Sequence, residues 1–420
     1  MKIVIVGGGW AGCAAAYMAA KQGADVVLTE RTDMLLGTGL VGGIMNNNGR
    51  LTVAKEMMAM GGGDFFGIID SCLRHKQVDF PGHLHGDIYD IVKTPMDIYE
   101  YLLRLNVDIR FNSRIIKVNQ TSGKLNTIED AKGNIYEGDV FIDTTGSAGP
   151  VSHCRKYGNG CAMCIMRCPS FGGRISLIAM AGIKEEMGRK GNQIGAMSGS
   201  CKIHKESLSN DIVENLNQNG VVVIPVPEAL IEDHLDIKSC QQYALDDYAK
   251  NIILLDTGHA KMMAPFYPLA KLRQIPGFEK ARYEDPYAGG LGNSMRFFAI
   301  APRDNRLKVI GLENVFCGGE KAGLLVGHTE AIMTGILAGY NASMYALGKE
   351  LLTFPRSLAI GEGIAYINEM LKRPEGLEKK YTYSGSVLLD HISECGLYTI
   401  DDEEIINRVK ACGMEDFFVN

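Results

Sequence analysis

The sequence predicts an α/β protein in which a parallel sheet is interrupted by an α+β insert and followed by a helical C-terminal region. Lys2–Val6 is a short apolar run that leads into a glycine-rich turn, as expected for a buried parallel strand. Val140–Ile142 and Leu307–Phe316 have the same character, and the long segment between them has a mixed pattern. The tail after Phe354 has the pattern of helices.

Periodicity predicts the other elements in chain order. We expect helices at Ala14–Lys21, Leu51–Met60, Thr94–Leu105, Ser207–Asn217 and His328–Leu347. We expect strands at Asp25–Thr29, Ile109–Phe111, Ile115–Gln120, Leu125–Asp130, Ile135–Tyr136 and Val221–Val226. A first domain is expected at residues 1–150 and 304–345, an inserted domain at 151–303 and a helical region at 346–420.

Charge and composition argue against some classes of protein. The formal net charge is −6, which gives no general basic surface, so we expect no nucleic-acid partner. The N-terminus lacks the features of a signal peptide, and no apolar run approaches the roughly 18 residues of a spanning helix. We therefore expect a cytoplasmic protein without membrane contact, whose 11 cysteines are mostly reduced.

The first strand is followed by a dinucleotide-binding motif. Gly7, Gly9 and Gly12 form G-x-G-x-x-G between this strand and the first helix. Such glycines allow a tight turn, close approach of a pyrophosphate and close helix–strand packing. Glu30 ends the second strand, where a carboxylate can accept hydrogen bonds from ribose hydroxyls. The motif and its context predict a Rossmann-like nucleotide site.

Later segments favour FAD over NAD. The strand at 140–142 runs into Asp143–Gly146, and another strand runs into Gly318–Glu320 ahead of a helix that begins near Gly327. These segments resemble those that pass beside the cofactor in FAD-binding domains of the glutathione-reductase type. The resemblance assigns these residues to the cofactor: Gly7, Gly9, Trp10, Ala11, Gly12, Glu30, Arg31, Gly37, Thr38, Gly39, Thr145, Gly146, Gly319, Glu320, Gly327, His328 and Thr329.

Further segments narrow the resemblance. Gly318–Glu320 and Gly335–Ala342 resemble the final flavin segment of one branch of the FAD-dependent oxidoreductase superfamily. That branch contains glucose-inhibited division protein A and the folate/FAD-dependent tRNA uracil methyltransferases, and Phe354–Arg356 resembles the methyltransferase tail. The loop Gly37–Gly43 resembles a broader group of FAD oxidoreductases. The resemblance covers about the first 150 residues and Leu307–Ile367, but not the cysteine-rich insert.

The insert carries a compact cysteine run. Its spacing is C-x6-C-x2-C-x3-C followed by proline, formed by Cys154, Cys161, Cys164 and Cys168. Part of this run resembles the bacterial ferredoxin motif and predicts a 4Fe–4S cluster beside the flavin. Structural zinc is the alternative, although zinc ribbons usually have two separated C-x2-C pairs. Cys201 is the reserve ligand if Cys154 is not one.

Candidate catalytic groups are less well defined. His328 and Glu330 begin the helix after the last flavin strand, and the resemblance implies that its positive end stabilises reduced flavin. Arg273 is a candidate anion clamp, as is Arg303. His83 and His85 lie in a predicted loop, where a solvated loop is favoured over a metal pair.

These observations lead to three functional hypotheses. The leading one is an FAD-dependent iron–sulfur oxidoreductase that relays electrons between a ferredoxin-like donor or acceptor and a flavin acting on a small-molecule substrate. The alternatives are an enzyme like the folate/FAD-dependent RNA uracil methyltransferases and a flavin and zinc redox-sensing scaffold. A homodimer is a general expectation.

Overall fold

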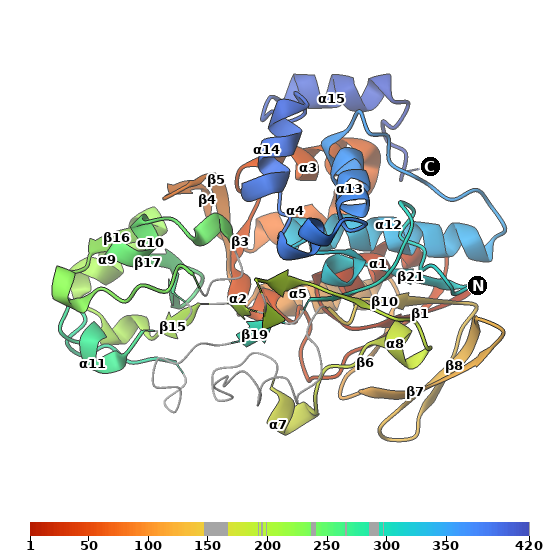
Figure 1. Cartoon of the computed structure of the whole chain (residues 1–420), viewed down its shortest axis with the longest axis horizontal. Coiled ribbons are helices and arrows are strands. Elements are labelled where there is room, and N and C mark those ends of the chain that lie inside the picture. The colour runs from red at the N-terminus through yellow and green to blue at the C-terminus, as the bar shows by residue number, and fades with distance from the viewer. Residues whose placement is uncertain are drawn as a thin grey trace.

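The computed structural model describes residues 1–146, 167–191, 193–194, 196–198, 200–236, 241–264, 267–284, 294–296 and 298–419. Its centre is a five-stranded parallel sheet in the order β21-β10-β1-β2-β6 (Figure 1). The strands are β1 (Lys2–Val6), β2 (Asp25–Thr29), β6 (Asp108–Arg110), β10 (Val140–Asp143) and β21 (Val315–Cys317). This sheet confirms the predicted α/β class with a Rossmann-like domain.

Helices and a second sheet cover the two faces of the parallel sheet (Figure 1). The helices are α1 (Trp10–Lys21) and α12 (His328–Ala346), with α5 (Thr94–Arg104) packed beside α1. The antiparallel sheet on the other side contains β7 (Ile115–Thr121), β8 (Lys124–Asp130) and β9 (Ile135–Glu137).

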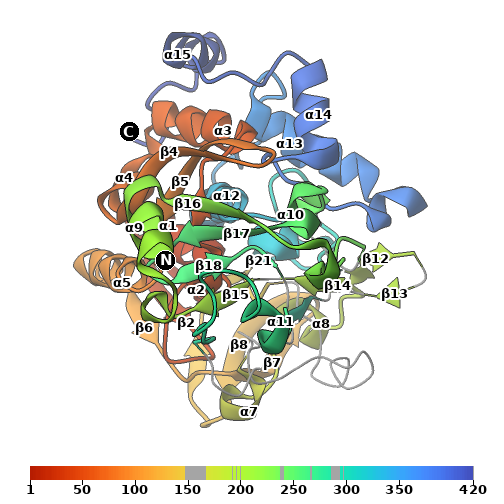
Figure 2. The same ribbon diagram turned by 90° about the vertical axis from the view of Figure 1, so that its left-hand side faces the viewer.

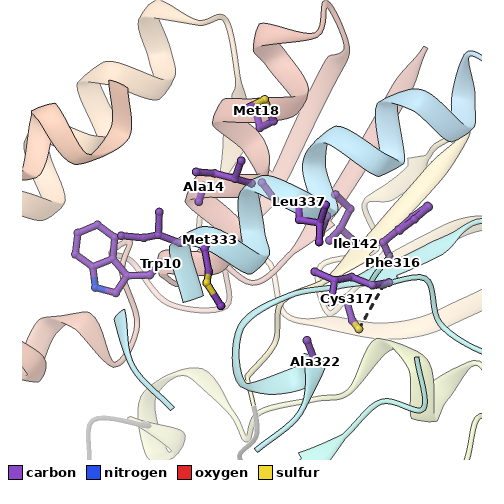
Figure 3. Packing of buried hydrophobic residues seen from close by; sticks show 14 of the residues in the cluster. Trp10, Ala14, Met18, Ile142, Phe316, Cys317, Ala322, Met333 and Leu337 are labelled. Carbon is purple, nitrogen blue, oxygen red and sulfur yellow. Dashed lines mark hydrogen bonds between the residues drawn. The ribbon is translucent and has the colours of Figure 1, made fainter. Parts of the chain in front are cut away.

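The two helices cross in backbone contact. A Cβ at Gly335 or Gly339 of α12 would overlap the carbonyl oxygen of Ala11 or Ala15 of α1. Small side chains therefore set the distance between these helices, and both helices can bring their N-termini to the same edge of the sheet. Figure 3 shows the apolar layer beneath them, which includes the fully buried Ile142 of β10.

The insert forms a smaller sheet with its own core (Figure 2). The strand order is β15-β18-β17-β16, and all pairs are antiparallel. These elements are β15 (Cys201–Ile203), β16 (Val221–Pro225), β17 (Asn251–Asp256) and β18 (Ala260–Met262), with α9 (Asn210–Asn219), α10 (Asp247–Lys250) and α11 (Leu269–Leu272).

A hairpin from the first part of the chain joins the insert to the parent domain. β4 (Leu73–Phe80) and β5 (His83–Tyr89) pair with β3 (Ile44–Met45), and side chains from Ile44 and Ile88 pack with Ile253 of the insert. Sequence reasoning expected only a loop around His83. Register shifts within the β4–β5 pair interrupt the strand pattern, which explains the error.

The C-terminal helices cover α3 (Gly49–Met57). They are α13 (Ala359–Met370), α14 (Ser386–Glu394) and α15 (Asp402–Ala411). A buried ion pair ties α3 to α12, since Arg50 Nε lies 2.9 Å from Glu330 Oε2. The main-chain amide of Tyr383, in the C-terminal region, donates to Glu330 Oε1 at 3.0 Å. Together they fix α3 and the C-terminal region against the N-terminal turn of α12.

Two predicted elements are interrupted at glycines with positive φ. The predicted strand at 307–316 turns back at Gly311, which has φ +93°, so that only Val315–Cys317 joins the sheet. The predicted helix at 51–60 changes to a π-helical turn at Met58–Gly62, where Gly61 has φ +81°.

The remaining α-helices and strands are short. They are α2 (Gly39–Gly42), α4 (Asp64–Ser71), α7 (Cys168–Phe171), α8 (Leu177–Met180), β11 (Glu186–Met187), β12 (Arg189–Lys190), β13 (Gln193–Ile194), β14 (Ala196–Ser198), β19 (Ser294–Arg296) and β20 (Ala299–Ile300). Among the described residues, no helix is both long enough and apolar enough to cross a membrane.

Candidate active site

A cavity of about 230 Å³ lies at the carboxyl edge of the parallel sheet. Val6 of β1, Thr29 of β2 and Thr144 directly after β10 line it. Open parallel sheets bind ligands at this edge, because the loops that follow neighbouring strands diverge there. The fold therefore places the cavity where a nucleotide is expected.

Most of the residues assigned to the cofactor line this one cavity: Gly7, Gly9, Trp10, Ala11, Glu30, Arg31, Gly37, Thr38, Thr145, Gly146, Gly319, Glu320, Gly327 and His328. Gly12, Gly39 and Thr329 do not line it. A Cβ at Gly12 would overlap the Gly7 carbonyl oxygen, so this glycine serves helix–strand packing. Thr329 is fully buried and donates to the sulfur of Met45 at 3.3 Å.

The turn before α1 leaves room for a pyrophosphate. Gly7 has φ +105°, and a Cβ there would lie 2.5 Å from the Thr144 carbonyl oxygen. A Cβ at Gly9 would meet no atom within 4 Å, and Gly9 lines the cavity. The open space is at the N-terminus of α1, where main-chain amides and the helix dipole favour phosphate. The residues present therefore fit the pyrophosphate of a dinucleotide.

Glu30 is held in position at one end of the cavity. Its Oε2 accepts a hydrogen bond from the Gly8 amide at 2.7 Å, and its Oε1 accepts from the Thr32 amide at 2.8 Å. The side chain is therefore fixed before any ligand arrives. Glu30 lines the cavity, where a carboxylate oxygen can accept a further hydrogen bond from a ribose hydroxyl.

Arginines surround the Glu30 end of the cavity. Arg31 and Arg114 donate to the carbonyl oxygens of Gly172 and Gly173 at 2.6 and 2.8 Å, which ties the segment after α7 to this end. Arg167 and Arg174 also line the cavity. The adenosine side of a dinucleotide would therefore lie in a locally positive environment, despite the net negative charge of the chain.

The opposite end is formed by α2 and the start of α12. The pyrophosphate is expected over Gly9 and the adenosine beside Glu30. The flavin is therefore expected at the end of the cavity formed by α2 and α12. The His328 ring packs against Gly42, where a Cβ would overlap the ring. His328 Nδ1 lies 3.2 Å from the carbonyl oxygen of Ile44 and 3.3 Å from the hydroxyl of Tyr89.

The insert supplies a wall that sequence reasoning missed. It consists of Ser200, Gln242, Tyr243, Lys261 and Met263. Lys261 donates to the carbonyl oxygen of Gly42, and Figure 2 shows β18 beside α2. The Ser200 hydroxyl is buried without a hydrogen-bond partner in the part of the chain that the structure describes. No motif marks these residues, because only the tertiary fold brings them to the cavity.

Of the three catalytic candidates, only His328 lines the cavity. Glu330 is fully buried in its ion pair with Arg50. Arg273 lies at the end of α11 and donates to the Ala281 carbonyl oxygen at 2.9 Å. Arg303 is also buried and donates to the Ala322 carbonyl oxygen at 2.8 Å. These contacts give Glu330, Arg273 and Arg303 structural roles.

His83 lies in the interface rather than in a solvated loop. Its ring stacks on Phe80 with centroids 4.8 Å apart and lies 4.6 Å from the ring of Tyr243. Nδ1 lies 2.7 Å from the Asn47 amide nitrogen, and Nε2 lies 3.1 Å from the Gln242 carbonyl oxygen. Burial, aided by the charge of Arg50, lowers the pKa of His83 to about 3.

The cysteine run is described only at its end. Cys168 is half-buried at the start of α7, while Cys154, Cys161 and Cys164 lie outside the described residues. Gly146 and Arg167, on either side of the segment that holds these three cysteines, both line the cavity. Cys201 is fully buried in the insert core, where burial raises the pKa of its thiol to about 12 and disfavours a metal-binding thiolate.

A second group of ligand-type residues lies between α13 and α14. Glu362, His391 and Cys395 lie close together, with His391 Nε2 2.7 Å from Glu362 Oε1. Arg356 already donates to both Glu362 oxygens, at 2.7 and 2.9 Å. This arrangement is a hydrogen-bonded network that joins the two helices.

Among solved structures, the chain resembles Aquifex aeolicus GidA, with a TM-score of 0.65 and 16% identity over 99% of this chain and 73% of the other. Among curated proteins, a methylenetetrahydrofolate–tRNA-(uracil-5-)-methyltransferase from Anoxybacillus flavithermus is 44% identical over 23% of this chain. A tRNA uridine 5-carboxymethylaminomethyl modification enzyme from Chlorobaculum tepidum is 30% identical over 34% of this chain. These alignments span 22% and 25% of the two relatives.

The relatives correct the prediction about partners. A small-molecule substrate and no nucleic acid were expected from the net charge of −6. Both curated relatives are named as enzymes that modify tRNA, so this expectation is wrong. Net charge averages over the whole surface and does not report a local binding site.

The turn before α1 yields a direct test of cofactor binding. We expect Gly9→Ala to leave the fold intact and to weaken FAD binding by about tenfold or more, equal to about 1.4 kcal/mol, because the added methyl group occupies only ligand space. FAD titration of the apoprotein measures this effect. The matched control is Gly67→Ala, which also meets no atom within 4 Å but does not line the cavity. Equal FAD affinity in both variants would contradict this position for the pyrophosphate.

The buried His83 yields a pH test of stability. Its pKa falls from 6.5 in the unfolded chain to about 3. The contribution of neutral His83 to the free energy of unfolding is therefore fully present above pH 6.5 and is lost as the pH falls towards 3. At pH 5 the loss is on the order of 2 kcal/mol relative to His83→Gln, as measured by urea unfolding. His85→Gln, on the same hairpin, should keep the wild-type dependence. Parallel curves for the wild type and His83→Gln would show that His83 does not carry the effect.

The sequence profile of one family covers most of the chain. The profile described as "Glucose inhibited division protein A" matches residues 2–263 and 258–350. These ranges include the glycine motif, the strands of the parallel sheet, the insert wall and α12. The match supports FAD as the cofactor of an enzyme. The chain belongs to the glucose inhibited division protein A family.

Proposed function

We propose that this chain is an FAD-dependent enzyme that modifies carbon 5 of a uracil base in tRNA. The names of the two curated relatives differ in the group that is added, but both specify position 5 of uracil or uridine in tRNA. The shared chemistry is therefore a change at C5 of a pyrimidine base beside a flavin.

The observation that carries this proposal is the wall that the insert adds at the flavin end of the cavity. Gln242 offers an amide that can both donate to and accept from the imide edge of uracil. Tyr243 offers an aromatic ring of the kind on which bases stack. The Ser200 hydroxyl, buried without a partner among the described residues, is a further hydrogen-bonding group.

A base within a folded RNA reaches such a cavity only when it leaves its stack. Enzymes that act on a base pay a few kcal/mol to turn it outward and then hold it by stacking and edge contacts. The insert wall would supply both kinds of contact on one side of the cavity, and Gly9 and Glu30 would hold the cofactor on the other. FAD, when bound, supplies two-electron oxidation or reduction at this position.

The proposal predicts selective RNA binding and a missing modification. The FAD-loaded protein should bind an unmodified tRNA transcript with an affinity that falls steeply as salt rises, because phosphate contacts release counterions. Gln242→Ala should weaken modification while FAD remains bound. Mass spectrometry of nucleosides from a strain that lacks the gene should show the loss of one uridine modified at C5. An unchanged set of C5-modified uridines would contradict the function.

A second proposal concerns the cysteine run: we propose that it holds a 4Fe–4S cluster that exchanges single electrons with the flavin. It is supported by the C-x2-C-x3-C-P spacing and by Gly146 and Arg167, which bring the ends of the described chain around this run to the cavity. Such a cluster is compatible with action on RNA, since it would supply or remove electrons rather than bind the base.

Metal analysis separates the cluster from zinc. Anaerobically purified protein should contain about four iron and four acid-labile sulfide per chain, as a 4Fe–4S cluster requires, with a broad visible shoulder that dithionite bleaches. Cys164→Ser should lose this iron, and Cys412→Ser, a half-buried cysteine outside the run, should keep it. One zinc per chain without iron or sulfide would rule out the electron relay.

A further inference from the structure

Lys261 combines burial with a position at the cavity. Lys261 is the middle residue of β18, is 6% exposed and lines the cavity. Its ammonium group donates to the carbonyl oxygen of Gly42 in α2. The insert thus carries a cation into the flavin end of the parent domain's cavity.

Burying the Lys261 ammonium group costs free energy, and a neutral side chain could make the same hydrogen bond. Taking an ammonium group out of water costs several kcal/mol unless other groups compensate for the lost hydration. A neutral donor such as glutamine would satisfy the Gly42 carbonyl oxygen equally well. The hydrogen bond to Gly42 does not by itself require a charge, and a ligand in the cavity that carries or acquires negative charge would compensate part of the cost of burying one.

A second positive feature, the N-terminus of α12, lies beside Gly42. α12 has 19 residues and begins at His328, whose ring packs on Gly42, the residue that Lys261 contacts. The first residues of α12 carry amides without intrahelical partners and the positive end of the helix dipole. The helix end and the ammonium group therefore act on one region at the flavin end of the cavity.

The change in charge when FAD is reduced indicates which form of the cofactor the α12 N-terminus and Lys261 would stabilise. Two electrons and one proton convert FAD to its anionic reduced form, which adds one negative charge, centred on the N1 and C2 carbonyl side of the flavin. A fixed positive charge beside that side favours the reduced form over the oxidised form. A pyrophosphate over Gly9 places the flavin half of the dinucleotide towards α2 and α12.

We propose that Lys261 is a catalytic residue of the flavin site whose ammonium group stabilises reduced FAD through the N1 and C2 carbonyl side of the ring. The insert then has a second role besides forming the substrate wall, because it sets the tendency of the flavin to accept electrons. This inference rests on FAD binding and does not depend on the identity of the substrate.

The test measures the flavin midpoint potential of three FAD-loaded variants by equilibration with reference dyes. Lys261→Met removes the charge and the hydrogen bond, Lys261→Gln keeps a donor and removes the charge, and Lys261→Arg keeps the charge. We expect Met and Gln to favour oxidised FAD about tenfold more than the wild type does, which is about 30 mV for a two-electron couple. Arg should retain most of the wild-type potential.

A matched control separates a local charge from the general field of the protein. Lys202 of β15 is the register partner of Lys261, but it pairs with Glu284 at 3.5 Å and does not line the cavity. Lys202→Met should keep the wild-type potential. The proposal is supported if only the charge-removing Lys261 variants shift.

Three results would overturn the proposal. One is a wild-type potential in both Lys261→Met and Lys261→Gln. Another is an equal shift in Lys202→Met, which would indicate a general field. The third is a loss of FAD in every Lys261 variant, including Arg, which would make Lys261 a structural link between β18 and α2. Because no RNA is present, none of these results bears on the proposed action on tRNA.

Discussion

The backbone contact between α1 and α12 is the constraint on which the site depends. Gly335 and Gly339 of α12 have no side chains to separate the helices, and they contact the backbone of Ala11 and Ala15 in α1. The N-termini of both helices can then face one cavity at the carboxyl edge of the sheet. One helix end suits a pyrophosphate and the other suits the reduced ring, so a single packing contact serves both halves of the dinucleotide.

The insert completes this site rather than standing apart from it. Its core is separate, but Lys261 contacts Gly42, and the β3-β5-β4 sheet packs against β16 and β17 through a shared apolar cluster. His83 is neutral in this interface, because burial, aided by the charge of Arg50, lowers its pKa to about 3. The interface is therefore apolar and uncharged around His83, carries the Arg74–Asp256 ion pair at another point, and places the Lys261 ammonium group next to the cavity.

The part of the site that is formed by residues close together in the chain could be predicted from the sequence. Gly7, Gly9 and Glu30 are recognisable because the turn, the helix start and the strand end that they form follow one another within the first 30 residues of the chain. Ser200, Gln242 and Lys261 were missed because their role arises from the tertiary fold, and a lysine in a short strand looks like a surface residue. Glu330 was assigned to catalysis from its place at a helix start, and Arg50, far away in sequence, turns it into a structural group. The net charge misled the prediction about RNA, since it averages over the surface.

The central claim is that one dinucleotide spans the cavity from Glu30 to Lys261. A crystal structure of the chain soaked with FAD tests it most directly. The account predicts ribose density at Glu30, pyrophosphate density over Gly9, and the N1 and C2 carbonyl side of the flavin within hydrogen-bonding distance of the α12 amides or the Lys261 ammonium group. Density with the flavin at the Glu30 end, or with the ring turned away from α12 and Lys261, would contradict it.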